Sequence, residues 1–175
     1  MSTVKINRAP VMTLWGSVVA ERLGFDHDEA LTLGRVLTGL NAHTKAVSLG
    51  LVEPAPQEIA KHRDAMKKGQ TLHVDLMRRA VPVVRTPEGL RAVEKDKPVA
   101  PEGVEPYLKV KFGDALADAR RAMGVLAKSM PPAQLASRAY GLYEQFRPQI
   151  PAGVTGWGAK GLLDLDKIAG LARSK

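Results

Sequence analysis

Cysteine is absent from all 175 residues, and this excludes several kinds of site at once. Without a thiol, the chain cannot form disulfides, iron–sulfur clusters or thiolate zinc sites, and it has no cysteine nucleophile. Long apolar runs are lacking too, since no segment approaches the roughly 18 apolar residues that cross a bilayer. The first residues also lack the charged-then-apolar pattern of a secretory signal. These absences predict a soluble, cytoplasmic protein with no membrane partner.

Aromatic residues are scarce, at 5%, although 45% of the residues are hydrophobic. The core must therefore consist mainly of Leu, Val, Ala and Met, which suits packed helices better than a β-sandwich. We expect a mainly α fold of the α+β type. Residues 95–105 are rich in charge, proline and glycine, which is typical of a connection. The expected parts are residues 1–98 and 99–175, packed on each other as one compact unit.

Two helices are expected within the first fifty residues. One should begin at Pro10 and end at Gly24, because proline suits a first helical turn and glycine a helix end. The second should begin near His27, since Asp26 and Glu29 have the spacing of a capping box. Its end stays open, because both a break near residue 41 and a continuation to residue 50 fit the sequence.

The next three segments predict a helix, a strand and a hairpin. Residues 56–69 (PQEIAKHRDAMKKG) predict a third, strongly charged surface helix. Residues 72–77 alternate apolar and polar side chains, which predicts a half-buried strand. Residues 81–94 predict a hairpin, because Gly89 can adopt the positive φ of its turn, and Pro82 argues that this hairpin contributes an edge strand.

The remaining chain is expected to be helical. A short helix is expected at residues 105–113, a longer one from Asp114, and another over residues 131–146. Residues 151–161 (PAGVTGWGAKG) predict a loop. A last helix should begin at Asp164, a candidate N-cap.

Positive charge exceeds negative charge, with 26 Lys and Arg against 18 Asp and Glu, which gives a formal net charge of +8. The excess is concentrated between Lys61 and Arg91, where eight basic residues face three acidic ones, a difference of +5. Such an excess attracts polyanions, because each phosphate that is neutralised releases condensed counterions. A solvated face of ordinary charges explains the same pattern equally well.

The string VVAERLGFDHDEALTLGRVL resembles the helix-turn-helix pattern of bacterial DNA-binding proteins. It has an alanine in its first helix, an LG-type turn and a following apolar helix. The resemblance implies that the start of the second helix enters the major groove. Asp26, Asp28 and Glu29 stand there and would repel phosphates, so a capping role fits these acids better.

The charged helix at residues 57–68 is therefore the better candidate for contact with nucleic acid. With the hairpin that follows, the order of elements over residues 10–94 resembles a winged helix, which implies a non-enzymatic DNA-binding regulator or nucleoid-associated protein. A small α+β domain with a basic surface is the alternative. The candidate nucleic-acid-binding residues are Lys61, His62, Arg63, Lys67, Lys68, Arg78, Arg79, Arg85 and Arg91. DNA is the expected partner, RNA is the alternative, and the C-terminal helices could form a homodimer.

No catalytic or cofactor motif emerges. The four histidines are scattered without the spacing of a metal site, and no GxSxG motif is present. In GVTGWGAKG no Ser or Thr follows Lys160, as the phosphate-loop pattern requires. No cofactor or metal is expected. Trp15 is expected in the core because it lies on an apolar helix face. The alternative function is a helical interaction or scaffold protein that binds a partner through the surface around Tyr140, Tyr143 and Phe146.

Overall fold

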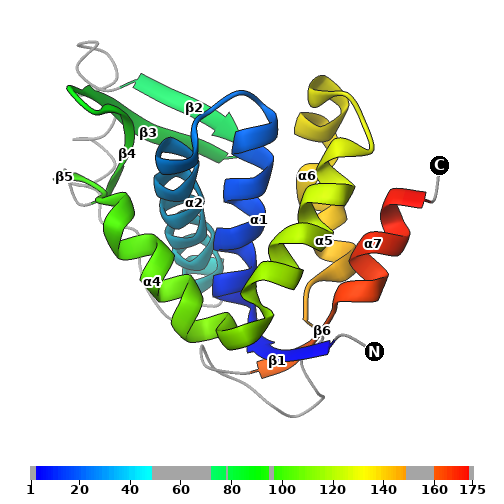
Figure 1. Ribbon diagram of the computed structural model, residues 1–175. Coiled ribbons are helices and arrows are strands. Elements are labelled where there is room, and N and C mark those ends of the chain that lie inside the picture. Colours follow the sequence, from blue (N-terminus) through cyan, green and yellow to red (C-terminus); the bar gives the residue numbers. More distant parts are fainter. Residues whose placement is uncertain (1–2, 49–71, 78, 95–96, 149–159, 174–175) are drawn as a thin grey trace.

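The computed structural model describes residues 3–48, 72–77, 79–94, 97–148 and 160–173 (Figure 1). Its helices are α1 (Arg8–Arg22), α2 (His27–Ser48), α4 (Pro101–Phe112), the 3-10 turn η1 (Gly113–Ala115), α5 (Leu116–Lys128), α6 (Pro132–Phe146) and α7 (Leu165–Arg173). Its strands are β1 (Thr3–Asn7), β2 (Leu72–Leu76), β3 (Arg79–Thr86), β4 (Gly89–Glu94), β5 (Lys97–Pro98) and β6 (Lys160–Asp164). The mainly helical fold with a small antiparallel sheet is confirmed. Among the helices described, none is long and apolar enough to cross a membrane.

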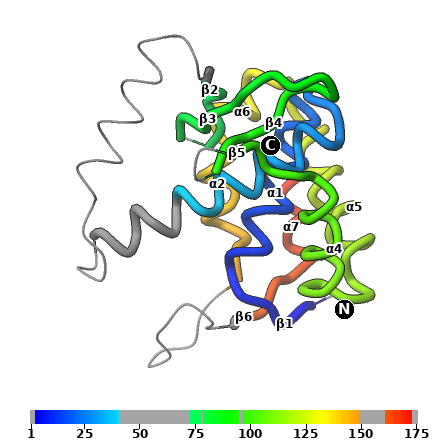
Figure 2. The backbone as a smooth tube through the Cα atoms, turned by 90° about the vertical axis from the view of Figure 1, so that its left-hand side faces the viewer, coloured from blue at the N-terminus to red at the C-terminus, as the bar shows by residue number. Residues whose placement is uncertain are grey.

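Helix α1 lies in the middle of the structure. It packs against α2 on one side and against α5 and α6 on the other, and the sheet formed by β2 to β5 lies beyond α2 (Figures 1 and 2). Every residue from Pro10 to Ala20 is buried. A helix that is covered on all sides must be apolar nearly all round, which the sequence VMTLWGSVVA provides.

Two glycines let α1 and α2 cross closely. A Cβ atom at Gly34 would collide with the carbonyl oxygen of Thr13, and a Cβ atom at Gly16 would lie 3.2 Å from Gly34 Cα. The backbones therefore meet where a larger side chain would hold them apart. As a result, Thr13 and Thr38 lie side by side, with their hydroxyl oxygens 2.7 Å apart.

The hairpin predicted at residues 81–94 is confirmed as β3 and β4, and Gly89 has the expected positive φ of 128°. The prediction of an edge strand at Pro82 is wrong, because the strand order is β2-β3-β4-β5 and β3 is an inner strand. The register explains how a proline fits there. Strand β2 pairs with residues 79–83 of β3, whereas β4 pairs with residues 83–86. Pro82 therefore pairs with β2 only. Because it lies outside the pairing of β3 with β4, its missing N–H removes no hydrogen bond between these two strands.

A second, two-stranded sheet was not predicted. Strand β1 pairs antiparallel with β6, from Thr3 opposite Asp164 to Asn7 opposite Lys160. The expected loop at residues 151–161 thus ends earlier, because Lys160 and Gly161 belong to β6. The pairing joins the start of the described chain to a segment more than 150 residues later.

The C-terminal helices follow the predictions closely, with one correction. Helix α4 begins at Pro101, so the expected connection at residues 95–105 is shorter than predicted and also contains β5. Proline suits this first helical position, since its fixed φ matches a helix. The cap predicted at Asp164 is confirmed, because its Oδ1 accepts hydrogen bonds from the N–H groups of Asp166 (3.0 Å) and Lys167 (3.2 Å).

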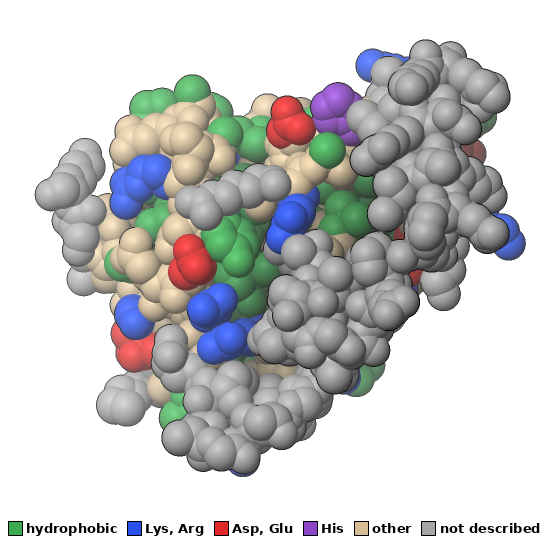
Figure 3. All heavy atoms as spheres, turned by 180° about the vertical axis from the view of Figure 1, so that it is seen from behind, with side chains coloured by type: hydrophobic (Ala, Val, Ile, Leu, Met, Phe, Trp, Pro, Cys, Tyr) green, Lys and Arg blue, Asp and Glu red, His purple; other side chains and the backbone are tan. Residues whose placement is uncertain are grey.

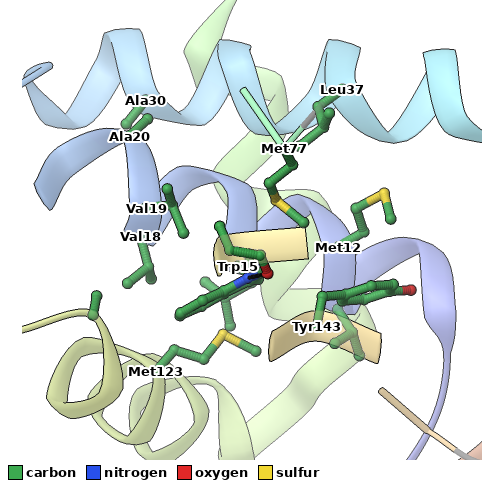
Figure 4. Close-up of a cluster of buried hydrophobic side chains, with 14 of the residues drawn as sticks. Met12, Trp15, Val18, Val19, Ala20, Ala30, Leu37, Met77, Met123 and Tyr143 are labelled. Carbon is green, nitrogen blue, oxygen red and sulfur yellow. Dashed lines mark hydrogen bonds between the residues drawn. The ribbon is translucent and has the colours of Figure 1, made fainter. Parts of the chain in front are cut away.

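Trp15 lies at the centre of the core, as expected, and is 0% exposed (Figure 4). Its Nε1 donates a hydrogen bond to the carbonyl oxygen of Ala139 (3.0 Å). Its ring packs edge-on against the Phe146 ring, with the ring centroids 5.3 Å apart. Figure 4 shows Met123 of α5 and Tyr143 of α6 on the same side of α1. One continuous hydrophobic cluster thus includes residues from both expected parts of the chain.

Candidate functional site

The structure describes three of the nine predicted nucleic-acid-binding residues. Arg79 and Arg85 lie on β3, and Arg91 lies on β4. The other six lie outside the described residues: Lys61, His62, Arg63, Lys67, Lys68 and Arg78. The helix expected at residues 57–68 lies outside them as well.

The three described arginines do not form one group. Arg79 and Arg85 are six residues apart on β3, so their side chains leave the same face of the sheet. Arg91 stands opposite Val84 in the register and so belongs to the other face. Arg85 is exposed beside the turn of the hairpin, and Arg79 is half-buried at the other end of the strand.

Arg91 is only 8% exposed. Its Nη1 donates a hydrogen bond to the carbonyl oxygen of Leu90, 2.9 Å away. A buried guanidinium in this position does not present its charge to a polyanion. The prediction for Arg91 considered its charge alone, and no local pattern around it indicates burial.

The unit that resembles a helix-turn-helix has a tight turn between α1 and α2. Gly24 has a φ of 115°, and the Phe25 N–H donates back to the carbonyl oxygen of Ala20. The capping box is present, because the Glu29 N–H donates to Asp26 Oδ1 (2.9 Å) and the Asp26 N–H donates to Glu29 Oε1 (3.1 Å). The capping interpretation of these two acids is confirmed.

Helix α2 also covers one edge of β4. The Leu90 N–H donates to Glu29 Oε2 (2.8 Å), and the Ala92 N–H donates to Thr32 Oγ1 (3.0 Å). The Thr32 hydroxyl itself donates to the carbonyl oxygen of Glu29 (2.9 Å). These contacts satisfy edge N–H groups that would otherwise be unpaired. The first turns of α2 are therefore docked on the hairpin through Glu29 and Thr32.

A chain of ionisable side chains joins four helices next to this turn. His27 Nδ1 lies 3.6 Å from Glu21 Oε2 at the end of α1, and His27 Nε2 lies 3.8 Å from Glu105 Oε1 on α4. Arg120 of α5 holds Glu105 with two hydrogen bonds, of 2.7 and 3.1 Å. These hydrogen bonds hold the pKa of the Glu105 carboxyl below its usual value. The arrangement fixes α4 against α5.

An open cavity of about 300 Å³ lies between α1, α2, α4 and the end of β4. It is lined by Thr13, Arg35, Thr38, Gly39, Glu94 and Tyr107. Sequence reasoning missed this cavity, because its residues come from four elements and form no motif. Its assembly depends on the close crossing of α1 and α2.

The C-terminal surface expected to bind a protein partner is largely internal. Tyr143 and Phe146 are each 2% exposed, and Tyr140 is partly buried against the same core. Burial raises the pKa of the Tyr143 phenol to about 12. The prediction of an exposed docking face was wrong for these two side chains, because the same apolar spacing serves to pack α6 against α1. The homodimer through these helices stays a prediction, and Val125 of α5, 49% exposed, is a large apolar side chain on their outer surface.

The charged side chains on the outside of the described chain are mixed in sign. Seen from behind, Lys and Arg are interspersed with acidic and uncharged groups (Figure 3). Within the described ranges, no cluster of three His, Asp or Glu side chains could hold a metal ion. The chain matches no protein family model, no curated protein and no solved structure.

Proposed function

We propose that this chain is a non-enzymatic, nucleic-acid-binding protein whose partner is DNA. The contact surface consists of the basic segment at residues 57–68 and the exposed side of the β3–β4 hairpin. The observation that carries the proposal is the excess of positive charge between Lys61 and Arg91, which is four when the buried Arg91 is left out (seven basic against three acidic residues). An excess of this kind supplies sequence-independent affinity for phosphates.

The position of the hairpin supports a winged-helix-like arrangement. The hairpin is docked on the start of α2 through Glu29 and Thr32, as a wing is held beside a helical unit. Arg85 is exposed next to its turn, where a wing contacts the DNA backbone. Glu88, also exposed in that turn, opposes the approach of phosphate. Reversing the charge of Arg85 and reversing that of Glu88 should therefore change DNA affinity in opposite directions.

Titration of a fluorescent DNA duplex, followed by anisotropy at several salt concentrations, tests this proposal. The affinity of the wild-type chain should fall steeply with salt. Replacing Lys67 and Lys68 together by Glu should weaken binding and reduce the slope of log K against log salt by about 0.9 for each phosphate that is no longer neutralised. Arg85→Glu should weaken binding, whereas Glu88→Lys should strengthen it.

Control variants separate a local surface from net charge. Lys128 and Arg138 are exposed on α5 and α6, and replacing both by Glu changes the net charge as much as the Lys67 and Lys68 pair does. This control should retain wild-type affinity. Equal losses in both double variants would reject a specific surface, and unchanged anisotropy at low salt would reject nucleic-acid binding. Competition by single-stranded RNA that exceeds competition by duplex DNA would replace DNA with RNA.

A further inference from the structure

The open cavity between α1, α2, α4 and β4 is lined by one positive and one negative side chain. Arg35 reaches it from α2 and Glu94 from the end of β4, and Arg35 Nε lies 3.4 Å from Glu94 Oε2. Their side chains are 43% and 37% exposed. A single long contact at this exposure contributes little to stability. A bound molecule can therefore replace it at small cost.

The geometry of the pair leaves room for a second partner on each side. Arginine carries five N–H donors in a planar fork, and the contact with Glu94 uses the Nε donor alone. The two terminal nitrogens have the geometry that binds a carboxylate through parallel hydrogen bonds. The Glu94 carboxylate retains acceptor positions for a cation.

Neutral hydrogen-bonding groups line the rest of the cavity. The Thr38 hydroxyl donates to the carbonyl oxygen of Gly34 (2.9 Å), so Thr13 donates in the contact between the two hydroxyls. The Thr13 oxygen therefore keeps an acceptor position. Burial raises the pKa of the Tyr107 phenol above 10.0, so this hydroxyl stays protonated at neutral pH and can donate.

We propose that this cavity binds a small zwitterion of the amino-acid type, with its carboxylate on Arg35 and its ammonium on Glu94. The lining is neutral in sum but contains both signs, and a zwitterion matches this pattern. A ligand with one charge would interact with one of the two residues and gain nothing from the other. A volume of about 300 Å³ accommodates a free amino acid, at the lower end of the range for small-molecule sites. This inference does not depend on nucleic-acid binding.

Isothermal titration of the full chain with each standard amino acid at millimolar concentration tests the proposal. At least one amino acid should bind. Its N-acetyl derivative lacks the ammonium and its methyl ester lacks the carboxylate, so each should bind about tenfold more weakly or worse. These ligand variants leave the protein unchanged, so folding does not affect their outcome. Heat signals absent for every amino acid would overturn the proposal, as would a derivative that binds as tightly as its parent.

Protein variants assign each charge to its residue. Arg35→Gln should remove the preference for the parent amino acid over its methyl ester, and Glu94→Gln should remove the preference over the N-acetyl derivative. The exposed pair of Arg121 and Asp118 on α5, 3.2 Å apart, provides the matched control. Arg121→Gln and Asp118→Asn should bind as the wild type does. Full binding by Arg35→Gln and Glu94→Gln would place the ligand elsewhere and overturn the assignment.

Discussion

At the residue scale, Thr32 shows how one side chain can join two layers. It is 0% exposed, and its hydroxyl accepts from the Ala92 N–H while it donates to the carbonyl oxygen of Glu29. A threonine in a helix interior commonly bonds to its own helix. Here the same oxygen also satisfies the edge of a strand sixty residues away in the sequence.

Thr32→Val should therefore be clearly destabilising, although it hardly changes the size of the side chain. The variant leaves the buried Ala92 N–H without an acceptor, which costs about 1–3 kcal/mol. Thr32→Ser keeps the hydroxyl and loses one buried methyl group, so it should cost only about 1 kcal/mol. Urea unfolding followed by circular dichroism measures both. A valine variant as stable as the wild type would show that the hydroxyl bridge contributes nothing.

At the scale of elements, the start of α2 depends on the pair formed by Asp26 and Glu29. Asp26→Ala removes the acceptor for the Glu29 N–H and should lower the free energy of unfolding by about 1 kcal/mol. Asp28 is exposed in the same first turn, so Asp28→Ala loses the same charge near the helix end. It should cost less, about 0.3–1 kcal/mol. Equal losses in urea unfolding would mean that charge, and not the cap, matters here.

Elements with strong local signals could be predicted from the sequence. Capping residues located the starts of α2 and α7, and the Thr86–Gly89 turn located the hairpin, because each depends on residues within one turn of the chain. Strands β1 and β6 could not be predicted in this way. Each is five residues long, and their pairing connects segments that are far apart in the sequence. The inner position of β3 likewise depends on partners that Pro82 does not reveal.

In the candidate sites too, features that depend on neighbouring residues could be predicted, and features that depend on distant contacts could not. Asp26 and Glu29 were interpreted correctly as capping residues, because a capping box is local. The burial of Arg91 and of Tyr143 could not be predicted, since it depends on which elements cover them. The cavity beside Arg35 depends on the approach of α1 to α2 at Gly34, and isolated glycines in a helix do not specify which helix approaches.

At the scale of the whole molecule, packing connects the two expected parts. Trp15 of α1 contacts Ala139 and Phe146 of α6. Strand β1 has β6 as its partner, and Ile6 of β1 is 2% exposed. These contacts bury core residues of both parts against each other. Unfolding of one part would therefore expose the core of the other. Unfolding should then be cooperative across the chain.

We therefore expect a single urea transition in which Trp15 fluorescence and far-ultraviolet circular dichroism have the same midpoint. Trp157→Phe removes the other tryptophan, so that the fluorescence reports Trp15 alone. In this background Ile6→Ala should shift both midpoints together, by about 2–5 kcal/mol in the free energy of unfolding. Val110→Ala, at a residue that is 80% exposed, should change it by no more than about 0.5 kcal/mol. Two separated transitions, or an Ile6 effect confined to one probe, would show that the parts unfold independently.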